Sequence, residues 1–167
     1  MKGDSESNLV KIYFYLEQDD DGYPPVATES LWARELQDNM YCIDNIPFYA
    51  KGVSLNDIVT AKPNEENLLF FRKIIQPSGH STIRVIIFED ADVSSWQHEL
   101  EKFGCASEKD YLPQLISVDI PPTVDIQNVW ALLEEGLHND QLEYEDACIQ
   151  HKNDKWGQSK IKKVIGI

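Results

Sequence analysis

Apolar and polar residues alternate with a period of two along several short stretches of the chain, a pattern typical of strands with one buried face. The first stretch covers residues 9–18 (LVKIYFYLEQ) and ends at the acidic turn DDDGYPP. Three more short runs follow at residues 41–50, 57–63 and 68–76, separated by polar turns. Short strands joined by tight polar turns predict a small, curled antiparallel sheet of the barrel kind.

Helical spacing appears first at residues 27–39, where Leu31, Trp32 and Leu36 form an apolar stripe and Thr28 suits the N-cap position. The second half of the chain then alternates between the two periods. It predicts a strand at 82–90, a helix at 94–104 closed by Gly104, a strand at 112–122, and one helix or two over 125–150, with Gly136 marking a break near 136–140.

The order of these elements predicts an α+β fold. Two β-α halves form a ferredoxin-like α/β sandwich, and a small antiparallel, SH3-like barrel is inserted between them at about residues 41–76. Residues 1–151 are expected to form a single compact domain, followed by a basic C-terminal tail at residues 152–167.

The charge of the chain is strongly negative and uneven. It has 15 Lys and Arg against 29 Asp and Glu, a net charge of −14, and residues 1–151 hold −18 because the last sixteen residues carry five Lys and one Asp. Such a body repels nucleic acid and anionic membranes, and its field favours encounter with a basic protein. Acidity also keeps a protein soluble, and that simpler reading stays open.

Three cysteines, Cys42, Cys105 and Cys148, are far apart and lack any CxxC spacing. Neither a disulfide framework nor a zinc site is expected, and no cofactor or other metal is predicted. No apolar stretch approaches 18 residues and no signal peptide pattern opens the chain, so a cytoplasmic protein is expected.

Reactive side chains gather in one place, the stretch PSGHSTIRVIIFE at residues 77–89. His80 lies between Ser78 and Ser81, too close in sequence for an ordinary triad, and no G-x-S-x-G elbow occurs. A turn that starts a strand, with hydroxyls bound to backbone groups, explains the motif better. We therefore predict that the protein is not an enzyme.

Arg84 needs a partner on this strand, because Thr82, Arg84 and Ile86 share one of its faces. If that face is covered, a carboxylate such as Glu29 or Asp44 should pair with the guanidinium. If it is open, Arg84 could bind a small anion together with His80 and Asn45.

Carboxylates concentrate in two segments, residues 19–22 and 133–147, each of which is either a solvated face or a surface for a basic partner. Aromatic residues beside the acids would anchor such a partner. The predicted partner-binding residues are Asp19, Asp20, Asp21, Tyr23, Glu134, Glu135, Asp140, Glu143, Tyr144 and Glu145.

A longer motif runs through the chain: a Glu-x-x-Trp segment, then Asn-x-Pro-Phe, Gly-x-x-x-x-Asp-x-Val and Ser-Gly-His-Ser-Thr. It is carried by Glu29, Trp32, Asn45, Pro47, Phe48, Gly52, Asp57, Val59 and residues 78–82. This pattern resembles an uncharacterised family of small bacterial proteins with a domain of unknown function, over roughly residues 10–150. The cluster of interest within it is Trp32, Asn45, Ser78, His80, Ser81 and Arg84.

The resemblance implies little about function, although the chain is similar in size and charge to small acidic bacterial immunity proteins. We therefore expect an immunity protein that neutralises a basic, nuclease-type toxin by occluding its active cleft. The alternative is a small enzyme or anion-binding protein that uses His80 and Arg84. The oligomeric state is left open.

Overall fold

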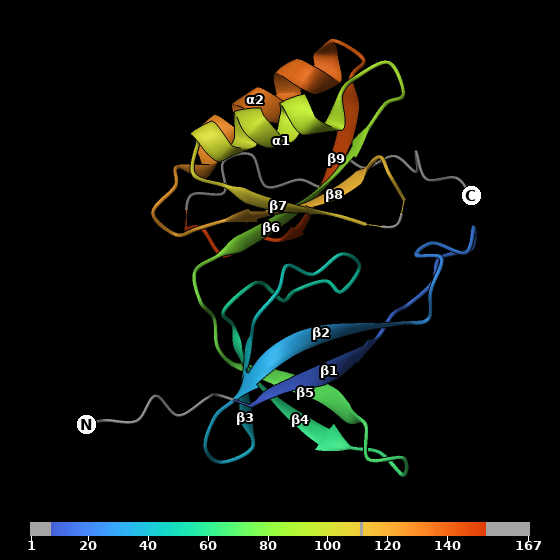
Figure 1. Ribbon diagram of the computed structural model, residues 1–167, viewed down its shortest axis with the longest axis vertical. Helices are drawn as coiled ribbons and strands as arrows, with labels where there is room; N and C mark the ends of the chain where they lie inside the picture. The colour runs from blue at the N-terminus through green and yellow to red at the C-terminus, as the bar shows by residue number, and fades with distance from the viewer. Residues whose placement is uncertain (1–7, 111, 153–167) are drawn as a thin grey trace.

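A computed structural model describes residues 8–110 and 112–152 (Figure 1). The chain first builds a closed five-stranded barrel and then a four-stranded sheet covered on one face by two helices. The barrel strands are β1 (Leu9–Tyr15), β2 (Thr28–Glu35), β3 (Met40–Ile43), β4 (Ile58–Pro63) and β5 (Leu69–Gln76). The second part contains β6 (Ser81–Ile87), α1 (Val93–Lys102), β7 (Ala106–Lys109), β8 (Leu115–Ile120), α2 (Ile126–His138) and β9 (Leu142–Cys148).

The barrel is an antiparallel meander in which each strand pairs with the next. A short parallel pairing of β1 with β5 closes it, with Ile12 opposite Leu69 and Tyr13 opposite Phe70. Its interior is apolar, and Ile12, Leu31 and Val59 are fully buried there. Because the barrel is closed, its strands offer no free edge for pairing with another chain.

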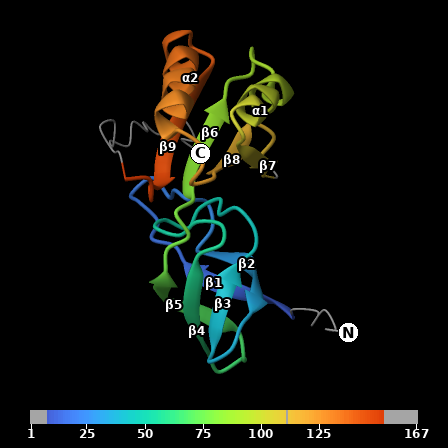
Figure 2. The ribbon, with the colours of Figure 1, turned by 90° about the vertical axis from the view of Figure 1, so that its left-hand side faces the viewer.

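The second sheet has the order β7-β8-β6-β9, with neighbouring strands antiparallel. Helices α1 and α2 lie side by side over one of its faces, as Figure 2 shows from the end. Alternation decides which side chains meet the helices: Ile83, Val85 and Ile87 point into that core, and Trp130 of α2 is fully buried against them. The opposite face, which carries Thr82 and Arg84, looks toward the barrel.

Several elements are confirmed. The α+β class holds, and the predicted strands at 57–63, 68–76, 82–90 and 112–122 and the helix at 94–104 are present within a few residues. The Asp92 carboxylate caps that helix by accepting the N–H of Ser94. The short edge strand β7 was not predicted, because its sequence, ASEK, has no apolar alternation.

The helix predicted at 27–39 is wrong, because these residues form β2 and a turn. The alternation of buried Leu31 and Ala33 with exposed Trp32 decides the conformation, and the strand pairs with β1 from Thr28 to Arg34. Asp38 and Asn39 then turn the chain with positive φ angles. Pairing with neighbouring strands has overridden a spacing that also fitted a helix.

The helical prediction for 125–150 is wrong in its second half. Helix α2 ends at His138 and Gly136 does not break it; a turn with Asp140 in the left-handed region leads into β9. Leu142 and Tyr144 are buried with a period of two, which is the strand pattern.

The barrel also extends further than the predicted insert at 41–76. It takes in β1 and β2 and precedes the second sheet, so it does not interrupt a sandwich. The prediction of a single domain over residues 1–151 stays a prediction. The predicted basic tail falls, except for Lys152, outside the described residues.

Candidate functional site

Most of the family-motif residues meet where the barrel faces the second sheet, whereas the side chain of Trp32 lies on the outer surface of the barrel and is exposed. A long connection between β3 and β4, residues 44–57, lies across the polar face of that sheet (Figure 1). We call this contact the seam. It consists of the β3–β4 loop together with Thr82, Arg84, Ser117, Asp119 and Glu145, five polar residues that are each at most 4% exposed.

Two side chains hold the loop in shape, that of Glu29 from β2 and that of Asn45 from the loop itself. The Glu29 carboxylate accepts three backbone N–H groups in succession, those of Phe48, Tyr49 and Ala50, at 2.7–2.9 Å. The Asn45 side-chain oxygen accepts the backbone N–H of Trp32 at 2.7 Å. The side-chain oxygen of Asn45 is therefore engaged by the backbone of β2.

Arg84 is 2% exposed and is held from two sides. Its Nη1 donates to the carbonyl of Phe48 at 2.7 Å, and its Nη2 lies 3.3 Å from Oε2 of Glu145, which also pairs with Lys51. The need for a partner is thus confirmed, but the predicted partners were wrong. Glu29 binds the loop backbone, and the exposed Asp44 pairs with Arg34 at 3.3 Å.

Asp57 links three segments that are distant in sequence. This fully buried carboxylate accepts the backbone N–H groups of Ser54 and Ser78, at 2.9 and 2.8 Å, and the side-chain amide of Gln150 at 2.9 Å. The sequence motif contained Asp57 but gave it no role. The sequence feature that could have indicated a role is that Asp57 is the one carboxylate in an otherwise strand-like run, at its first position.

His80 and Asp119 form a pair at one end of the seam, with His80 Nδ1 2.8 Å from Asp119 Oδ1. The other ring nitrogen of His80 lies 3.4 Å from the amide nitrogen of Asn56. Burial raises the pKa of Asp119, and the hydrogen bond from His80 opposes that rise. Both nitrogens of His80 therefore face protein groups.

Ser81 resembles an activated nucleophile at first sight, because its hydroxyl lies 2.5 Å from His151 Nδ1. His151 Nε2 lies 3.1 Å from the carbonyl of Pro121, so Nε2 carries the proton and Nδ1 accepts from Ser81. Ser81 Oγ also accepts the N–H groups of Gln150 and His151, and the residue is fully buried. Its role here is to fasten the chain after β9 to β6.

The structural interpretation of the SGHST turn is supported, with one difference. The Ser78 hydroxyl accepts the N–H of His80 within the turn and also donates to the carbonyl of Leu55. The donors that reach Ser81 come from residues about seventy positions away. Tertiary contacts of this kind have no signature in the local sequence.

The predicted partner-binding residues fall into two groups. Asp20, Asp21, Glu135 and Asp140 are exposed, and Asp19 shapes its own turn by accepting the N–H groups of Asp21 and Tyr23.

The remaining residues are held inside the fold. Tyr144 is buried in the core with its hydroxyl bound to Glu134, and Glu145 is in the seam. Glu143 and Tyr23 are half-buried, and burial raises the pKa of Tyr23. Tyr144 and Glu145 are corrected as partner-binding residues, because residues 142–148 form a strand of the sheet and not an exposed helix.

Other chemistry is limited in the part of the chain that the structure describes. Residues 8–110 and 112–152 contain no group of three or more His, Cys, Asp or Glu arranged to hold a metal ion. The three cysteines are buried free thiols, and burial raises the pKa of Cys105 to about 12, so this thiol stays protonated. No described helix is long and apolar enough to cross a membrane.

These features define an α+β protein in which a barrel and a helix-covered sheet are joined by a buried polar seam. The chain belongs to the family described as domain of unknown function DUF4265, whose model matches residues 29–144. The expectation of a family with a domain of unknown function is confirmed, whereas the link to toxin immunity stays a prediction. The match begins at Glu29 and includes Asn45, Asp57, His80 and Arg84.

A solved structure supports the fold. The chain is similar to a hypothetical protein from Neisseria gonorrhoeae, described as a novel crystal structure, with a TM-score of 0.70 and 24% sequence identity. The likeness covers 86% of this chain and 95% of that one. At this identity it shows the fold alone. No curated protein matches the sequence.

Proposed function

We propose that this protein is an acidic binding protein for a basic partner, and specifically an immunity protein that occludes the active cleft of a basic, nuclease-type toxin. The observation that carries the proposal is the uneven placement of charge. Residues 81–152 contain fifteen Asp and Glu against four Lys and Arg, and the carboxylates of the seam account for few of them.

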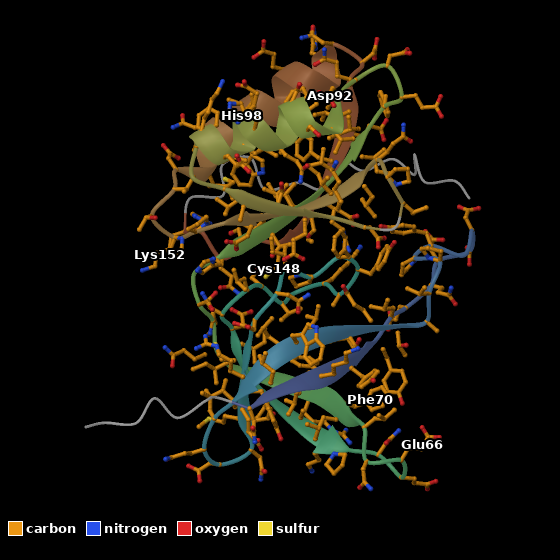
Figure 3. The ribbon with its side chains drawn as sticks, in the orientation of Figure 1. Glu66, Phe70, Asp92, His98, Cys148 and Lys152 are labelled. Atoms are coloured by element: carbon orange, nitrogen blue, oxygen red, sulfur yellow. The ribbon has the colours of Figure 1, made fainter. Side chains whose placement is uncertain are left out.

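Exposed carboxylates converge at the outer end of the helix layer. The end of β6 lies beside the start of β9, because the N–H of Phe88 donates to the carbonyl of Gln141 at 2.9 Å. This contact brings the β6–α1 loop next to the end of α2, and Figure 3 shows Asp92 at this end of the molecule. We call this surface the acidic end; its exposed residues are Glu89, Asp90, Asp92, Glu135 and Asp140.

The acidic end suits a partner whose surface is rich in Lys and Arg. A concentrated negative field steers a basic protein toward it and raises the association rate, and salt weakens this effect. Nuclease domains carry basic clefts because their substrates are polyanions. An acidic protein that covers such a cleft would also compete with the substrate for it.

The alternative function, a small enzyme or anion-binding protein that uses His80 and Arg84, has less support. The guanidinium of Arg84 meets a carbonyl and a carboxylate, and the imidazole of His80 lies between Asp119 and Asn56. Each of these groups has a structural partner in the seam, which leaves the acidic end as the better candidate for binding.

We also propose the finer description of the fold. The element order β-α-β-β-α-β from β6 to β9, with the sheet order β7-β8-β6-β9, supports a ferredoxin-like sandwich. The closed five-stranded meander of residues 9–76 supports an SH3-like barrel.

The test is affinity capture from the native bacterium, followed by association kinetics with the captured protein. Reversal of Glu89, Asp90 and Asp140 to Lys should slow association about tenfold or more, and raising the salt from low to physiological strength should slow the wild type. Asp92 is left intact because it caps α1. The matched control reverses Glu65 and Glu66, two exposed residues in the β4–β5 turn at the other end.

Two results would contradict the proposal: an association rate that does not change with salt, or equal slowing of association in the acidic-end and control variants.

The seam provides a further comparison. His80→Ala and Ser81→Ala should lower the free energy of unfolding by about 1–3 kcal/mol and leave capture intact. If instead the thermal melts are unchanged and a hydrolytic or transferase activity disappears, the enzyme alternative is correct.

A further inference from the structure

The outer surface of the barrel is unusually apolar. Among the described residues, six large apolar residues are exposed, and five of them lie on the barrel strands or directly after β2: Leu9, Tyr15, Trp32, Leu36 and Ile75. Tyr15 is 75% exposed and Trp32 is 46% exposed. Exposed apolar groups that lie together, unlike scattered ones, indicate a contact surface.

The exposed rings lie together because the strand register aligns them. Tyr13 is opposite Phe70 across the β1–β5 pairing, and both residues are at outward positions. The Tyr15 and Phe70 rings are stacked with centroids 4.4 Å apart, and those of Tyr13 and Phe70 are 5.6 Å apart. On the next strand, Trp32 is opposite Lys11, whose ammonium lies 5.0 Å from the ring centre. We call Tyr13, Tyr15, Trp32 and Phe70 the aromatic face.

Lysines stand beside the rings of the aromatic face, although the net charge of the whole chain is −14. Lys11, Lys62 and Lys73 occupy outward positions on β1, β4 and β5, and Lys62 is directly opposite Phe70. The outward positions of β1, β2, β4 and β5 include no Asp or Glu. Exposed carboxylates occur at the borders of this surface: Glu17 follows Tyr15 by two residues, Glu35 ends β2, and Glu66 lies beyond Phe70 at the tip of the barrel in Figure 3.

We infer that the aromatic face binds an extended peptide segment of another protein, in which apolar side chains are flanked by carboxylates. The apolar side chains would cover the rings of Tyr15, Phe70 and Trp32, where burial removes apolar surface from water. The carboxylates would pair with Lys11 on one side and with Lys62 and Lys73 on the other. Side chains must provide this recognition because the closed barrel offers no strand edge.

Single-stranded nucleic acid, which also binds basic surfaces with aromatic rings, fits less well. The net charge of −14 repels a polyanion, whereas a short peptide with a few carboxylates meets much less repulsion. Bases need open ring faces for stacking. Here Tyr15 and Phe70 already stack on each other, and Lys11 covers Trp32.

The experiment is a selection from a displayed library of random peptides, each about twelve residues long, against the full chain. The enriched peptides should combine apolar residues with Asp or Glu. Their affinity, measured by fluorescence anisotropy, should fall about tenfold or more for Tyr15→Ser and for Lys62→Glu. Both residues are exposed, so the fold should survive these changes, which thermal melts would verify.

The matched control is Phe103→Ser, which removes an aromatic ring that is 39% exposed next to α1, in the other half of the molecule. It should leave the affinity within about twofold. The inference fails if no peptide is enriched, if the enriched peptides are basic, or if Phe103→Ser weakens them as much as Tyr15→Ser does. Saturable binding of oligo(dT) that Lys62→Glu abolishes would assign the face to nucleic acid. Dimerisation of the free chain that Tyr15→Ser abolishes would assign it to a second copy.

The aromatic face and the acidic end lie on different halves of the chain, as the labelled Phe70 and Asp92 show in Figure 3. Loss of peptide binding in Tyr15→Ser therefore leaves the acidic end unchanged, and the two proposals can fail separately.

Discussion

Buried polar residues explain most of what looked like chemistry in the sequence. Ser78, His80 and Ser81 stand beside one another in sequence, yet each is bound to a different distant segment: the β3–β4 loop, β8 and the chain after β9. The pattern correctly indicated that Arg84 needs a partner. It could not name Glu145, because that pairing depends on a strand predicted as a helix.

Asp119 provides a test at the scale of one residue. Burial raises its pKa above the ordinary 3.8, so the folded state binds its proton more tightly than the unfolded state does. Its contribution to the free energy of unfolding is therefore complete below about pH 3.8 and falls as the pH rises through the raised folded-state pKa. Asp119→Asn should remove this fall, since the amide oxygen still accepts from His80.

Urea unfolding of wild type and Asp119→Asn across the acidic pH range would measure the effect. The wild type should lose stability relative to the variant as the pH rises. Asp90→Asn, which changes an exposed carboxylate in the β6–α1 loop, is the control and should run parallel to the wild type. If the curve for Asp119→Asn also runs parallel to that of the wild type, burial does not destabilise the charged form of this carboxylate.

At the scale of elements, strands with a strict period of two were predictable and elements that fit two periods were not. In β1, buried Ile12 and Phe14 alternate with outward residues, and the strand begins where expected. Around β2, Trp32 and Leu36 also fit a helical spacing, and only the pairing with β1 and β3 selects the strand. In β9, charged residues alternate with Leu142 and Tyr144 because its second face covers the polar seam and not solvent.

Gly136 tests how helix α2 packs. A glycine inside a helix usually costs stability, so Ala is normally an improvement of about 1 kcal/mol. Here an added Cβ would lie 2.6 Å from Trp96 Cη2 and 2.7 Å from Leu142 Cδ2, much closer than real contacts. Gly136→Ala should therefore lower the free energy of unfolding by about 1–3 kcal/mol.

Chemical denaturation of Gly136→Ala beside Asn128→Ala would measure this, since Asn128 is exposed on the same helix and Ala there should be neutral or slightly stabilising. A gain in stability for Gly136→Ala would mean that Trp96 can move aside at no cost, contrary to the packing described.

At the scale of the molecule, two apolar cores are joined by polar contacts. One core fills the barrel around Ile12 and Leu31, and the other lies between the sheet and its helices around Val85 and Trp130. The sequence predicted that a barrel and an α/β layer both exist. It did not show which strands form the barrel and which form the second sheet, because that assignment depends on pairings between distant segments, such as β1 with β5.

Because the two cores are separate, their joint unfolding should depend on the seam, and above all on Asp57. This carboxylate binds the β3–β4 loop, the link between the barrel and β6, and Gln150 after β9. Asp57→Ala leaves buried donors without their acceptor and should cost about 2–4 kcal/mol. The barrel and the helix-covered sheet should then unfold at different temperatures.

The indole NMR signals of Trp32 and Trp130 report the barrel and the helix layer, respectively, during heating. In the wild type both should lose their native shifts together, and in Asp57→Ala they should separate. Asp44→Ala is the control, since the exposed Asp44, at the start of the β3–β4 loop, pairs with Arg34 of β2, so that both signals should still change together. If the signals also stay together in Asp57→Ala, the apolar contacts of the β3–β4 loop, made by buried residues such as Ile46 and Val53, couple the two halves without the carboxylate.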